Sequence, residues 1–314
     1  MYQLIIIGGA TAGLSAAIYA GRKKIKTIIL TDKVGGQSLL TDNIENYPGF
    51  KSITGQELTQ KMREQAEGVG VEIQEGQAVV KIEKAGAYFK VFTQKREEFE
   101  TKTIIIATGK KPRTLNVAGE KEFTSKGVSF CSICDAPLFN GKDVVVVGGG
   151  NSGLEAAWDL TKYANKIYVL EFGPKIKGDE LTQEKLKQTN KVEFIAEATV
   201  KEIKGGKFVE GLVYEDKKTN EQKELKVSGV FVNIGQIPGS DFTKGFLELN
   251  KWGEIIINPR TNETSVKGVY AAGDVTDVIF KQCIVAASEG AKAALGVYEY
   301  LEHVGDRDSN IKPK

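Results

Sequence analysis

Two glycine-rich turns constrain the fold of this chain more than any other feature. One reads GGATAG from Gly8 to Gly13, and the other reads GGGNSG from Gly148 to Gly153. An apolar, strand-like run precedes each turn, and an alanine-rich, helix-like run and a further strand-like run follow it. This order is typical of a β-α-β dinucleotide-binding unit, and its repetition predicts two related nucleotide-binding domains.

The chain that follows each unit repeats as well. Strand-like runs predict a β-meander after the first unit and a matching set of strands after the second. The tail adds two strand-like runs and one helix-like run. The strand-like runs are residues 79–84, 88–93, 103–106, 199–203, 209–215, 224–227, 230–234, 254–257 and 268–272, and the helix-like run is residues 285–301.

We therefore predict an α/β fold with two Rossmann-like, three-layer ββα domains, the second inserted into the first. The expected crossings between the domains are residues 110–113 and 239–244. The first domain would consist of residues 1–113 and 241–314, and the second of residues 114–240. A chain of 314 residues is long enough for two domains with buried cores.

The glycines of such a turn have distinct tasks. The first allows the bend, the second lets the backbone approach a pyrophosphate, and the third allows close packing of helix on strand. Gly148, Gly150 and Gly153 supply all three, with Asn151 and Ser152 between them, whereas the first turn has alanine in the second place. The alternative for each turn is a structural β-α turn with a solvated acid nearby.

An acidic residue follows the second strand of each unit, Asp32 in the first and Glu171 in the second. A carboxylate at this offset suits a ribose diol. A 2′-phosphate is normally held by arginine, and residues 114–259 contain no arginine. Lys175 and Lys177 follow Glu171 and could supply positive charge to a 2′-phosphate, so NADPH stays an alternative cofactor. The sequence favours NADH.

A Cys-x-x-Cys-Asp motif, formed by Cys131, Cys134 and Asp135, lies shortly before the second turn. Between two dinucleotide-binding signatures it predicts a dithiol that receives electrons from one cofactor by way of another. The alternative is a zinc site, which needs about four sulfur or nitrogen ligands. Only Cys283 and His303 could complete such a site, and both lie far away in the sequence, so we predict no metal.

Composition narrows the mechanism, the partners and the compartment. The single histidine argues against Ser-His-Asp and Cys-His mechanisms, so proton transfer falls to a carboxylate, a lysine or water. With 43 Lys and Arg against 41 Asp and Glu, the net charge of +2 gives no reason to expect a nucleic acid or a membrane surface as a partner. We expect no signal peptide and no transmembrane segment, and hence a cytoplasmic protein. Three cysteines there do not make a structural disulfide framework.

The whole chain resembles the low-molecular-weight thioredoxin reductase family, and within it the branch of the alkyl hydroperoxide reductase flavoprotein. The matching blocks follow the family's order from end to end. They are residues 35–37 (GGQ), 44–49 (IENYPG), 106–109 (IATG), 131–139 (CSICDAPLF) and 271–274 (AAGD), and residues 150–157 and 170–172 match the hydroperoxide-reductase branch. The His-Arg-Arg stretch of the NADPH-using reductases is absent.

The resemblance implies that FAD binds the first domain, that NADH binds the second, and that an interdomain rotation alternates the access of nicotinamide and dithiol to the flavin. Cys134 would face the flavin, Cys131 would attack the disulfide of a partner protein, and Asp135 would be the acid/base. The implied FAD-binding residues are Gly8, Gly13, Asp32, Gly36, Gln37, Asn46, Thr108, Gly109, Gly273, Asp274 and Gln282, and the implied NAD-binding residues are Gly148, Gly150, Asn151, Ser152, Gly153 and Glu171. The family also implies a homodimer.

Two departures from the family pattern matter. The hydroperoxide-reductase branch carries an extra N-terminal thioredoxin-like module, which is absent here, so we expect a separate thioredoxin-like or glutaredoxin-like protein as the electron acceptor. Ala136 replaces the usual glycine after the Cys-Asp pair, which could change the loop slightly. Other functions stay open: a flavin NADH oxidase, a dithiol oxidase or ferredoxin-driven disulfide reductase, or a redox-sensing flavoprotein without turnover.

Overall fold

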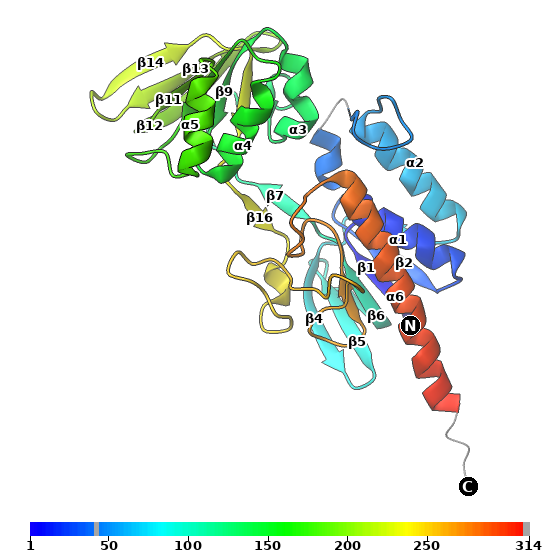
Figure 1. Cartoon of the computed structure of the whole chain (residues 1–314). Coiled ribbons are helices and arrows are strands. Elements are labelled where there is room, and N and C mark those ends of the chain that lie inside the picture. Colours follow the sequence, from blue (N-terminus) through cyan, green and yellow to red (C-terminus); the bar gives the residue numbers. More distant parts are fainter. Residues whose placement is uncertain (41–43, 310–314) are drawn as a thin grey trace. The chain divides into compact units, whose positions relative to one another are not determined.

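The computed structural model describes residues 1–40 and 44–309, and it confirms the predicted fold class (Figure 1). The chain divides into two compact units, the second inserted into the first. Unit 1 consists of Met1–Leu39, Tyr47–Lys111 and Ile237–Lys314, and unit 2 consists of Leu40–Asn46 and Pro112–Gln236. The chain crosses between them in β7 (Lys110–Pro112) and β16 (Gln236–Pro238), which pair with each other, and it also changes unit at the two ends of Leu40–Asn46.

A mainly parallel sheet forms the centre of unit 1. β1 (Tyr2–Ile7) lies between β2 (Thr27–Leu30) and β6 (Glu98–Ile106) and pairs in parallel with both. β3 (Glu72–Gln74) extends the sheet beyond β2, and β17 (Val269–Ala271) pairs with the C-terminal end of β6. The apolar runs that predicted β1 and β2 are fully or almost fully buried, as expected for strands that are covered on both faces.

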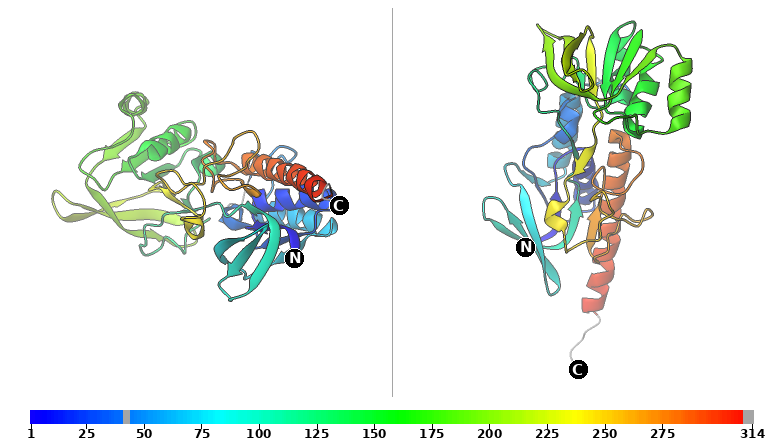
Figure 2. Two further views of the ribbon diagram at one scale, coloured as in Figure 1. Left: turned by 90° about the horizontal axis from the view of Figure 1, so that it is seen from below. Right: turned by 90° about the vertical axis from the view of Figure 1, so that its left-hand side faces the viewer.

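One face of this sheet is covered by helices. α1 (Thr11–Arg22) and α6 (Cys283–Ser309) pack along each other, and α2 (Gly55–Gly68) packs against α1 (Figures 1 and 2). The α1–α6 contact is close because both helices are rich in small residues. A Cβ added to Gly290 of α6 would lie only 2.0 Å from the backbone oxygen of Ala12 in α1.

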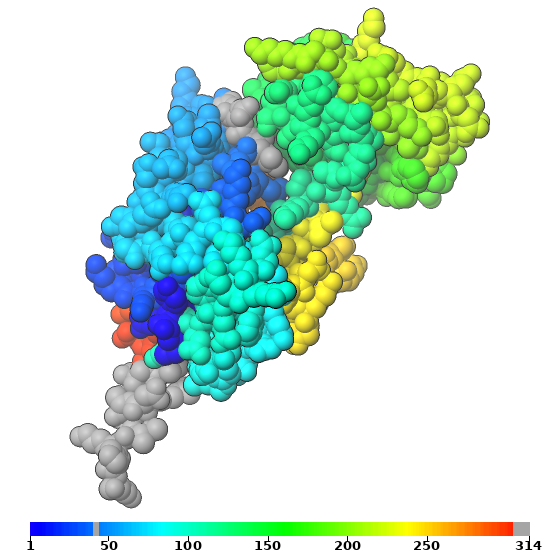
Figure 3. All heavy atoms as spheres, turned by 180° about the vertical axis from the view of Figure 1, so that it is seen from behind, coloured from blue at the N-terminus to red at the C-terminus, as the bar shows by residue number. Residues whose placement is uncertain are grey.

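The other face of the sheet is covered by the meander. β4 (Val79–Ala85) and β5 (Tyr88–Thr93) pair antiparallel, and β5 in turn pairs antiparallel with β6. Phe89 and Val91 point from this meander into the same core as Ile5 and Ile104 of the parallel sheet. In the space-filling view, α2 and the β4–β5 hairpin, in light blue to cyan, form much of the visible surface of unit 1 (Figure 3).

Unit 2 repeats this plan around a second parallel sheet. Its strand order is β11-β10-β9-β15-β8. α4 and α5 pack on one face of the sheet, and the antiparallel strands β12, β13 and β14 pack on the other. The bounds are β8 (Val128–Ser129), β9 (Asp143–Val147), α4 (Asn151–Leu160), β10 (Lys166–Leu170), α5 (Glu180–Gln188), β11 (Val192–Ile195), β12 (Ala198–Gly205), β13 (Val209–Asp216), β14 (Glu221–Leu225) and β15 (Gly229–Val232).

Short helical segments carry or border the functional residues. They are η1 (Gly36–Leu40), α3 (Ser132–Asp135), η2 (Ala136–Phe139) and η3 (Asp241–Thr243). The strand predicted at residues 254–257 is wrong, because in the described chain Ile255 makes only isolated bridges, to Leu249 and Thr276. Within the described ranges, no helix has the length and apolar character that a membrane crossing requires.

Candidate functional site

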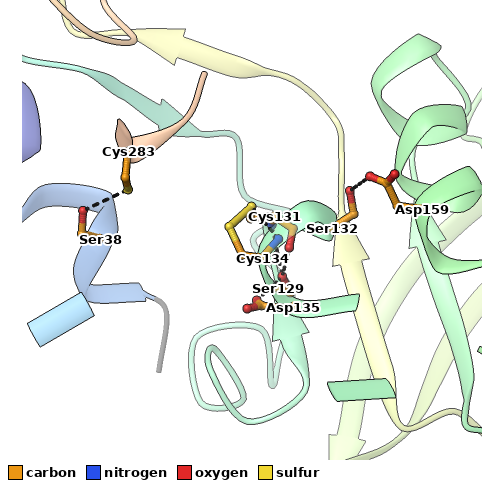
Figure 4. Close-up of a disulfide and its surroundings, with 8 residues drawn as sticks. All are labelled: Ser38, Ser129, Cys131, Ser132, Cys134, Asp135, Asp159 and Cys283. Atoms are coloured by element: carbon orange, nitrogen blue, oxygen red, sulfur yellow. Dashed lines mark hydrogen bonds between the residues drawn. A yellow bond between two sulfur atoms is a disulfide. The ribbon is translucent and has the colours of Figure 1, made fainter. Parts of the chain in front are cut away.

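The Cys131–Cys134 pair forms a disulfide at the start of α3, with a Cα–Cα distance of 5.4 Å (Figure 4). Cys131 is the N-cap of this helix, and its Sγ accepts a hydrogen bond from the Cys134 N–H at 3.3 Å. The same N–H would favour a thiolate on Cys131 after reduction. Ile133, between the two cysteines, is 57% exposed, so the turn is accessible from solvent in unit 2.

A partly buried hydrogen bond connects this turn to α4. The Ser132 hydroxyl, between the two cysteines, donates to Asp159 Oδ2 at 3.0 Å (Figure 4). Asp159 lies near the C-terminal end of α4, and the N-terminal end of α4 is the second glycine turn. One helix therefore links the dithiol to the predicted nucleotide site.

Asp135 lies in a hydrogen-bond network with Cys131. The Ser129 hydroxyl donates to Asp135 Oδ2 at 2.6 Å and accepts a hydrogen bond from the Cys131 N–H at 3.1 Å. The structure thus brings together the three residues that the sequence assigns to redox chemistry, and adds Ser129, which sequence reasoning missed. Ala136 is buried and has ordinary right-handed helical angles, so this position does not require the family's glycine.

The second glycine turn has the close contacts that a dinucleotide turn requires. Gly148 has a φ of +118°, and an added Cβ would lie 2.3 Å from the backbone oxygen of Asn233. A Cβ on Gly153 would lie 1.8 Å from the oxygen of Gly148, so helix and strand meet here without room for a side chain. A Cβ on Gly150 would meet no heavy atom within 4 Å in the described chain, so this position faces open space.

Glu171 is held beside this turn by backbone donors. Its Oε2 accepts a hydrogen bond from the Gly149 N–H and its Oε1 from the Gly173 N–H, both at 2.8 Å, and Lys177 Nζ lies 3.4 Å from Oε1. Burial alone would raise the pKa of this carboxyl, but the two N–H groups and Lys177 outweigh burial and lower it. Glu171 is therefore a carboxylate at neutral pH, and it would repel a 2′-phosphate.

The first turn has the same construction in unit 1. A Cβ on Gly8 would lie 2.4 Å from the oxygen of Ala107, and one on Gly13 would lie 1.9 Å from the oxygen of Gly8. Ala10, which replaces the middle glycine, is the N-cap of α1. Gly36 has a φ of +54°, and an added Cβ would lie 2.9 Å from the Ala10 Cβ, so Gly36 makes room for the alanine methyl.

The N-termini of α1 and α4 are suited to bind phosphate groups. In the described residues neither helix has a side-chain cap, whereas Thr54 and Glu57 form a capping box on α2 and Asp179 caps α5. The first N–H groups of a helix need acceptors, and an anion such as a pyrophosphate satisfies them. Uncapped helices behind glycine turns therefore fit a dinucleotide in each unit.

Asp32 and Glu171 do not occupy equivalent positions. The Gly8 N–H donates to the oxygen of Leu30, and the Gly148 N–H donates to the oxygen of Leu170. The counterpart of Glu171 is therefore Thr31, whose hydroxyl accepts a hydrogen bond from the Gly9 N–H at 3.1 Å. Asp32 is the next residue and is exposed, so its assignment to a ribose stays a prediction.

Two further implied FAD residues, Gln37 and Thr108, have hydrogen-bond partners within unit 1. Gln37 Nε2 donates to the oxygen of Lys110 at 2.6 Å, and the Thr108 hydroxyl donates to the oxygen of Gly239 at 2.7 Å. Gly109 has a φ of +64°. Gln282 precedes α6, and its oxygen accepts from a first-turn N–H of that helix. Asn46 belongs by its contacts to unit 2, so its assignment to FAD also stays a prediction.

Sequence reasoning missed Glu289, a buried acid on α6. Its Oε2 accepts a hydrogen bond from the Gly273 N–H at 2.7 Å, so it fixes the loop that carries Asp274. Burial raises the pKa of Glu289, and burial likewise raises the pKa of Asp274. The only sequence signal for Glu289 is an acid within a helix face of alanine and glycine.

Sequence reasoning also missed an ion cluster centred on Glu254. Its carboxylate pairs with Lys110 and lies 3.3 Å from Lys281 Nζ. Burial alone would raise the pKa of Glu254, but its hydrogen bonds to Lys110 and Asn250 and its charged neighbours lower it. Lys281 directly precedes Gln282, so the cluster fixes the chain that carries this implied flavin contact.

Asn233 is the counterpart of Ala107 in the repeat, because the N–H groups of both donate to the strand that precedes a glycine turn. Among the described atoms, Asn233 Oδ1 is buried and has no hydrogen-bond partner. A buried polar atom without a partner is costly, so its place beside Gly148 fits a ligand donor. Over residues 1–40 and 44–309, no cluster of His, Cys, Asp and Glu side chains is arranged to hold a metal ion.

Comparison with known proteins agrees with this arrangement. A model of the pyridine nucleotide-disulphide oxidoreductase family matches residues 2–290. An NADH dehydrogenase of Bacillus subtilis (strain 168) is 41% identical over 300 residues, which cover 96% of this chain and 58% of that protein. An alkyl hydroperoxide reductase subunit of Escherichia coli (strain K12) is 41% identical over 304 residues, with the same two coverages. The chain thus spans less than two thirds of these relatives.

Solved structures match over nearly their full length. A thioredoxin reductase from Streptococcus pyogenes MGAS5005 has a TM-score of 0.91 and 39% identity, and the match covers 96% of this chain and 99% of that one. A thioredoxin reductase from Giardia duodenalis has a TM-score of 0.89 and 35% identity, with the same coverages.

Proposed function

Because the chain belongs to the pyridine nucleotide-disulphide oxidoreductase family, we propose that it is an FAD-dependent disulfide reductase that prefers NADH to NADPH. The electrons would pass through Cys131 and Cys134 to a disulfide of a small thioredoxin-like or glutaredoxin-like protein. The observation that carries this proposal is the accessible cysteine pair at α3. The Ser132–Asp159 hydrogen bond connects it to α4, the helix that begins at the second glycine turn. The family as a whole uses FAD and a pyridine nucleotide.

Unit 1 would hold FAD through the open N-terminus of α1, the Gly8–Gly13 turn and the loop that carries Gly273 and Asp274. Bound FAD would supply two-electron chemistry, taking an electron pair from the nicotinamide and giving it to the disulfide. The side chains of Thr31, Gln37 and Thr108 make hydrogen bonds to backbone groups of the same unit and so stabilise its loops.

The protein's own sulfur chemistry then follows from the dithiol. The Cys131 thiolate would attack one sulfur of the partner's disulfide, so that a mixed disulfide forms and the partner's S–S bond breaks. Asp135 would give a proton to the leaving thiolate. Cys134 would next give its proton to the ionised Asp135 and attack Cys131 Sγ, so that the Cys131–Cys134 disulfide forms and the mixed disulfide breaks. The partner's second thiolate would leave with that proton from Asp135, and the partner is released as a dithiol.

The cofactor preference rests on Glu171. Its carboxylate is kept ionised by the Gly149 and Gly173 N–H groups, and it lies beside the turn where the ribose of the nucleotide would bind. Lys177 is 64% exposed and already paired with Glu171, so it offers less help to a 2′-phosphate than a free arginine would.

A second candidate is NADH oxidation with a different electron acceptor. The B. subtilis relative named NADH dehydrogenase favours it. In that case NADH would reduce the flavin, but the dithiol would not carry the electrons onward.

One experiment separates these proposals. The FAD-loaded protein is mixed anaerobically with NADH or NADPH while bleaching of the flavin is followed, and an oxidised thioredoxin-like protein is then added. We expect faster bleaching with NADH and reduction of the added disulfide. Cys134→Ser should keep the bleaching and lose the disulfide reduction, whereas Cys283→Ser, which leaves the dithiol intact, should keep both. No bleaching with either nucleotide would overturn the main proposal, and bleaching without disulfide reduction would favour the second.

The similarity to thioredoxin reductases also supports a homodimer and a cytoplasmic location as parts of this proposal. Light scattering of the purified protein tests the first, and cell fractionation tests the second.

A further inference from the structure

We propose that Ser129 is a positioning residue that holds Asp135 ready to protonate the leaving thiolate of the partner. This inference rests on the proposed function, since Asp135 is the acid/base of that proposal.

The Ser129 hydroxyl contacts both the carboxylate of Asp135 and the backbone of Cys131. Ser129 is 5% exposed, and its hydroxyl lies 2.6 Å from Asp135 Oδ2, 3.1 Å from the Cys131 nitrogen and 3.3 Å from the Cys131 oxygen (Figure 4). The hydroxyl therefore connects the carboxylate of the acid/base to the backbone of the attacking cysteine.

A hydroxyl has one proton to donate and can also accept. With Asp135 ionised, the short contact takes that proton, and the Cys131 N–H fills an acceptor position of the hydroxyl oxygen. Once Asp135 is protonated, the carboxyl can donate to Ser129, and the Ser129 proton can turn to the Cys131 oxygen. Ser129 therefore keeps Asp135 in one place in both protonation states.

The fold holds Ser129 rigidly enough for this task. Ser129 is the last residue of β8, and it pairs in parallel register with Phe231 of β15, a fully buried strand residue. The hydroxyl is thus fixed by the sheet of unit 2, while Asp135 belongs to the short helix α3. Asp135 is consequently positioned from a neighbouring element.

Thr182→Ala is the matched control for Ser129→Ala. Thr182 also lies in unit 2, and its hydroxyl also donates to a carboxylate, at 2.9 Å, but that carboxylate is Asp179 and not Asp135. Each protein is reduced with dithiothreitol and desalted, and a single turnover is measured with two oxidants. One oxidant is an oxidised thioredoxin-like protein, whose alkyl thiolate needs a proton on leaving, and the other is 5,5′-dithiobis(2-nitrobenzoate), whose aryl thiolate leaves without one.

We expect Ser129→Ala to slow the reaction with the protein disulfide by about 10- to 100-fold, the range for a lost hydrogen bond to a charged group. The reaction with the aryl disulfide should change by less than about threefold, and Thr182→Ala should change both reactions by less than about threefold. Ser129→Thr, which keeps a hydroxyl, should recover most of the rate with the protein disulfide. In the double variant, adding Ser129→Ala to Asp135→Asn should not slow this reaction further, because the hydroxyl acts through Asp135.

Equal losses in Ser129→Ala and Thr182→Ala, equal losses with both oxidants, or a further loss in the Asp135→Asn background would overturn the proposal. Circular dichroism shows whether Ser129→Ala is folded. If it is not, Ser129→Thr replaces it as the test, and a Ser129→Thr rate as low as that of Asp135→Asn would count against the proposal. A reduced wild-type protein that reacts with neither oxidant would instead refute the proposed function. These two failures are thereby distinguished.

Discussion

Glu171 and Glu289 are both buried and both accept hydrogen bonds from glycine N–H groups, yet their pKa values shift in opposite directions. Glu171 has two N–H donors and Lys177, and these outweigh the burial that opposes its charge. For Glu289 the single Gly273 N–H does not offset burial. The number of donors that face each carboxylate therefore decides its ionisation.

Glu289→Gln should make the stability of the cofactor-free protein less dependent on pH. The free energy of unfolding should fall less steeply as the pH rises than it does in the wild type. The raised pKa of Glu289, above its ordinary 4.5, means that the native state binds more protons than the unfolded state, so stability falls as pH rises through that window. Glutamine still accepts from the Gly273 N–H but does not titrate. Each unit of raised pKa corresponds to about 1.4 kcal/mol, and urea unfolding at a series of pH values from 4.5 upward measures the effect.

The control is Glu248→Gln, which removes an exposed carboxylate in the same unit. It should leave the slope of stability against pH unchanged. Some slope should persist in Glu289→Gln, because burial raises the pKa of Asp274 as well. An unchanged slope in Glu289→Gln would contradict the burial argument.

Glu171→Gln should raise the KM for NADH by about tenfold and narrow the preference over NADPH, because it removes the charge that favours a ribose diol. Steady-state kinetics with both nucleotides measure this. Glu193→Gln, at an exposed residue of the neighbouring strand β11, is the control and should leave both KM values in place. A lower KM for NADPH than for NADH in the wild type would count against the role of Glu171.

At the residue scale, the sequence could predict groups whose chemistry is local. The cysteines, Asp135 and the turn glycines stand in short motifs, and the structure brings each set together. Thr31 could not be distinguished from Asp32, because a shift of one residue reverses the face to which a strand side chain points. Ser129 acts across elements, so no local pattern marks it.

At the scale of elements, the two glycine turns test the division of tasks among their positions. Gly153→Ala should destabilise unit 2 by about 3 kcal/mol or more, because its Cβ would lie 1.8 Å from the backbone oxygen of Gly148. Gly150→Ala should fold normally, since its Cβ meets open space and Ala10 already stands at the equivalent place in unit 1. It should weaken nucleotide binding instead.

Thermal unfolding and NADH titration of the same two variants provide the check. The expected pattern is a lower melting temperature for Gly153→Ala alone, and weaker binding without loss of stability for Gly150→Ala. Equal destabilisation by both substitutions would show that Gly150 is a packing position and not a phosphate-facing one.

Elements were predictable where a strand or helix has its own periodic pattern and a clear end. The β-α-β units satisfy this condition, since an apolar run meets glycine and then alanine-rich helix. Residues 254–257 look like such a strand, but Glu254 is bound to Lys110 and Lys281, and Ile255 bridges single residues on either side. Long-range ion pairs and isolated bridges hold this segment, and neither leaves a periodic signal in the sequence.

At the scale of the whole molecule, each unit has its own sheet and its own core. Ile5, Ile104 and Phe89 belong to the core of unit 1, whereas Val145 and Phe231 belong to the cores of unit 2. The chain changes unit in β7 and β16 and at the two ends of residues 40–46. Residues that share one buried core unfold together, whereas separate cores can unfold independently. We therefore predict two unfolding transitions for this chain.

Scanning calorimetry of the full chain should therefore resolve two transitions when cofactor is absent. FAD at about 100 times its Kd should stabilise one of them by about 2.7 kcal/mol, since it binds only folded unit 1. Gly153→Ala should lower the other transition, because the clash lies in unit 2. A single transition that both FAD and Gly153→Ala displace would show that the two units unfold as one.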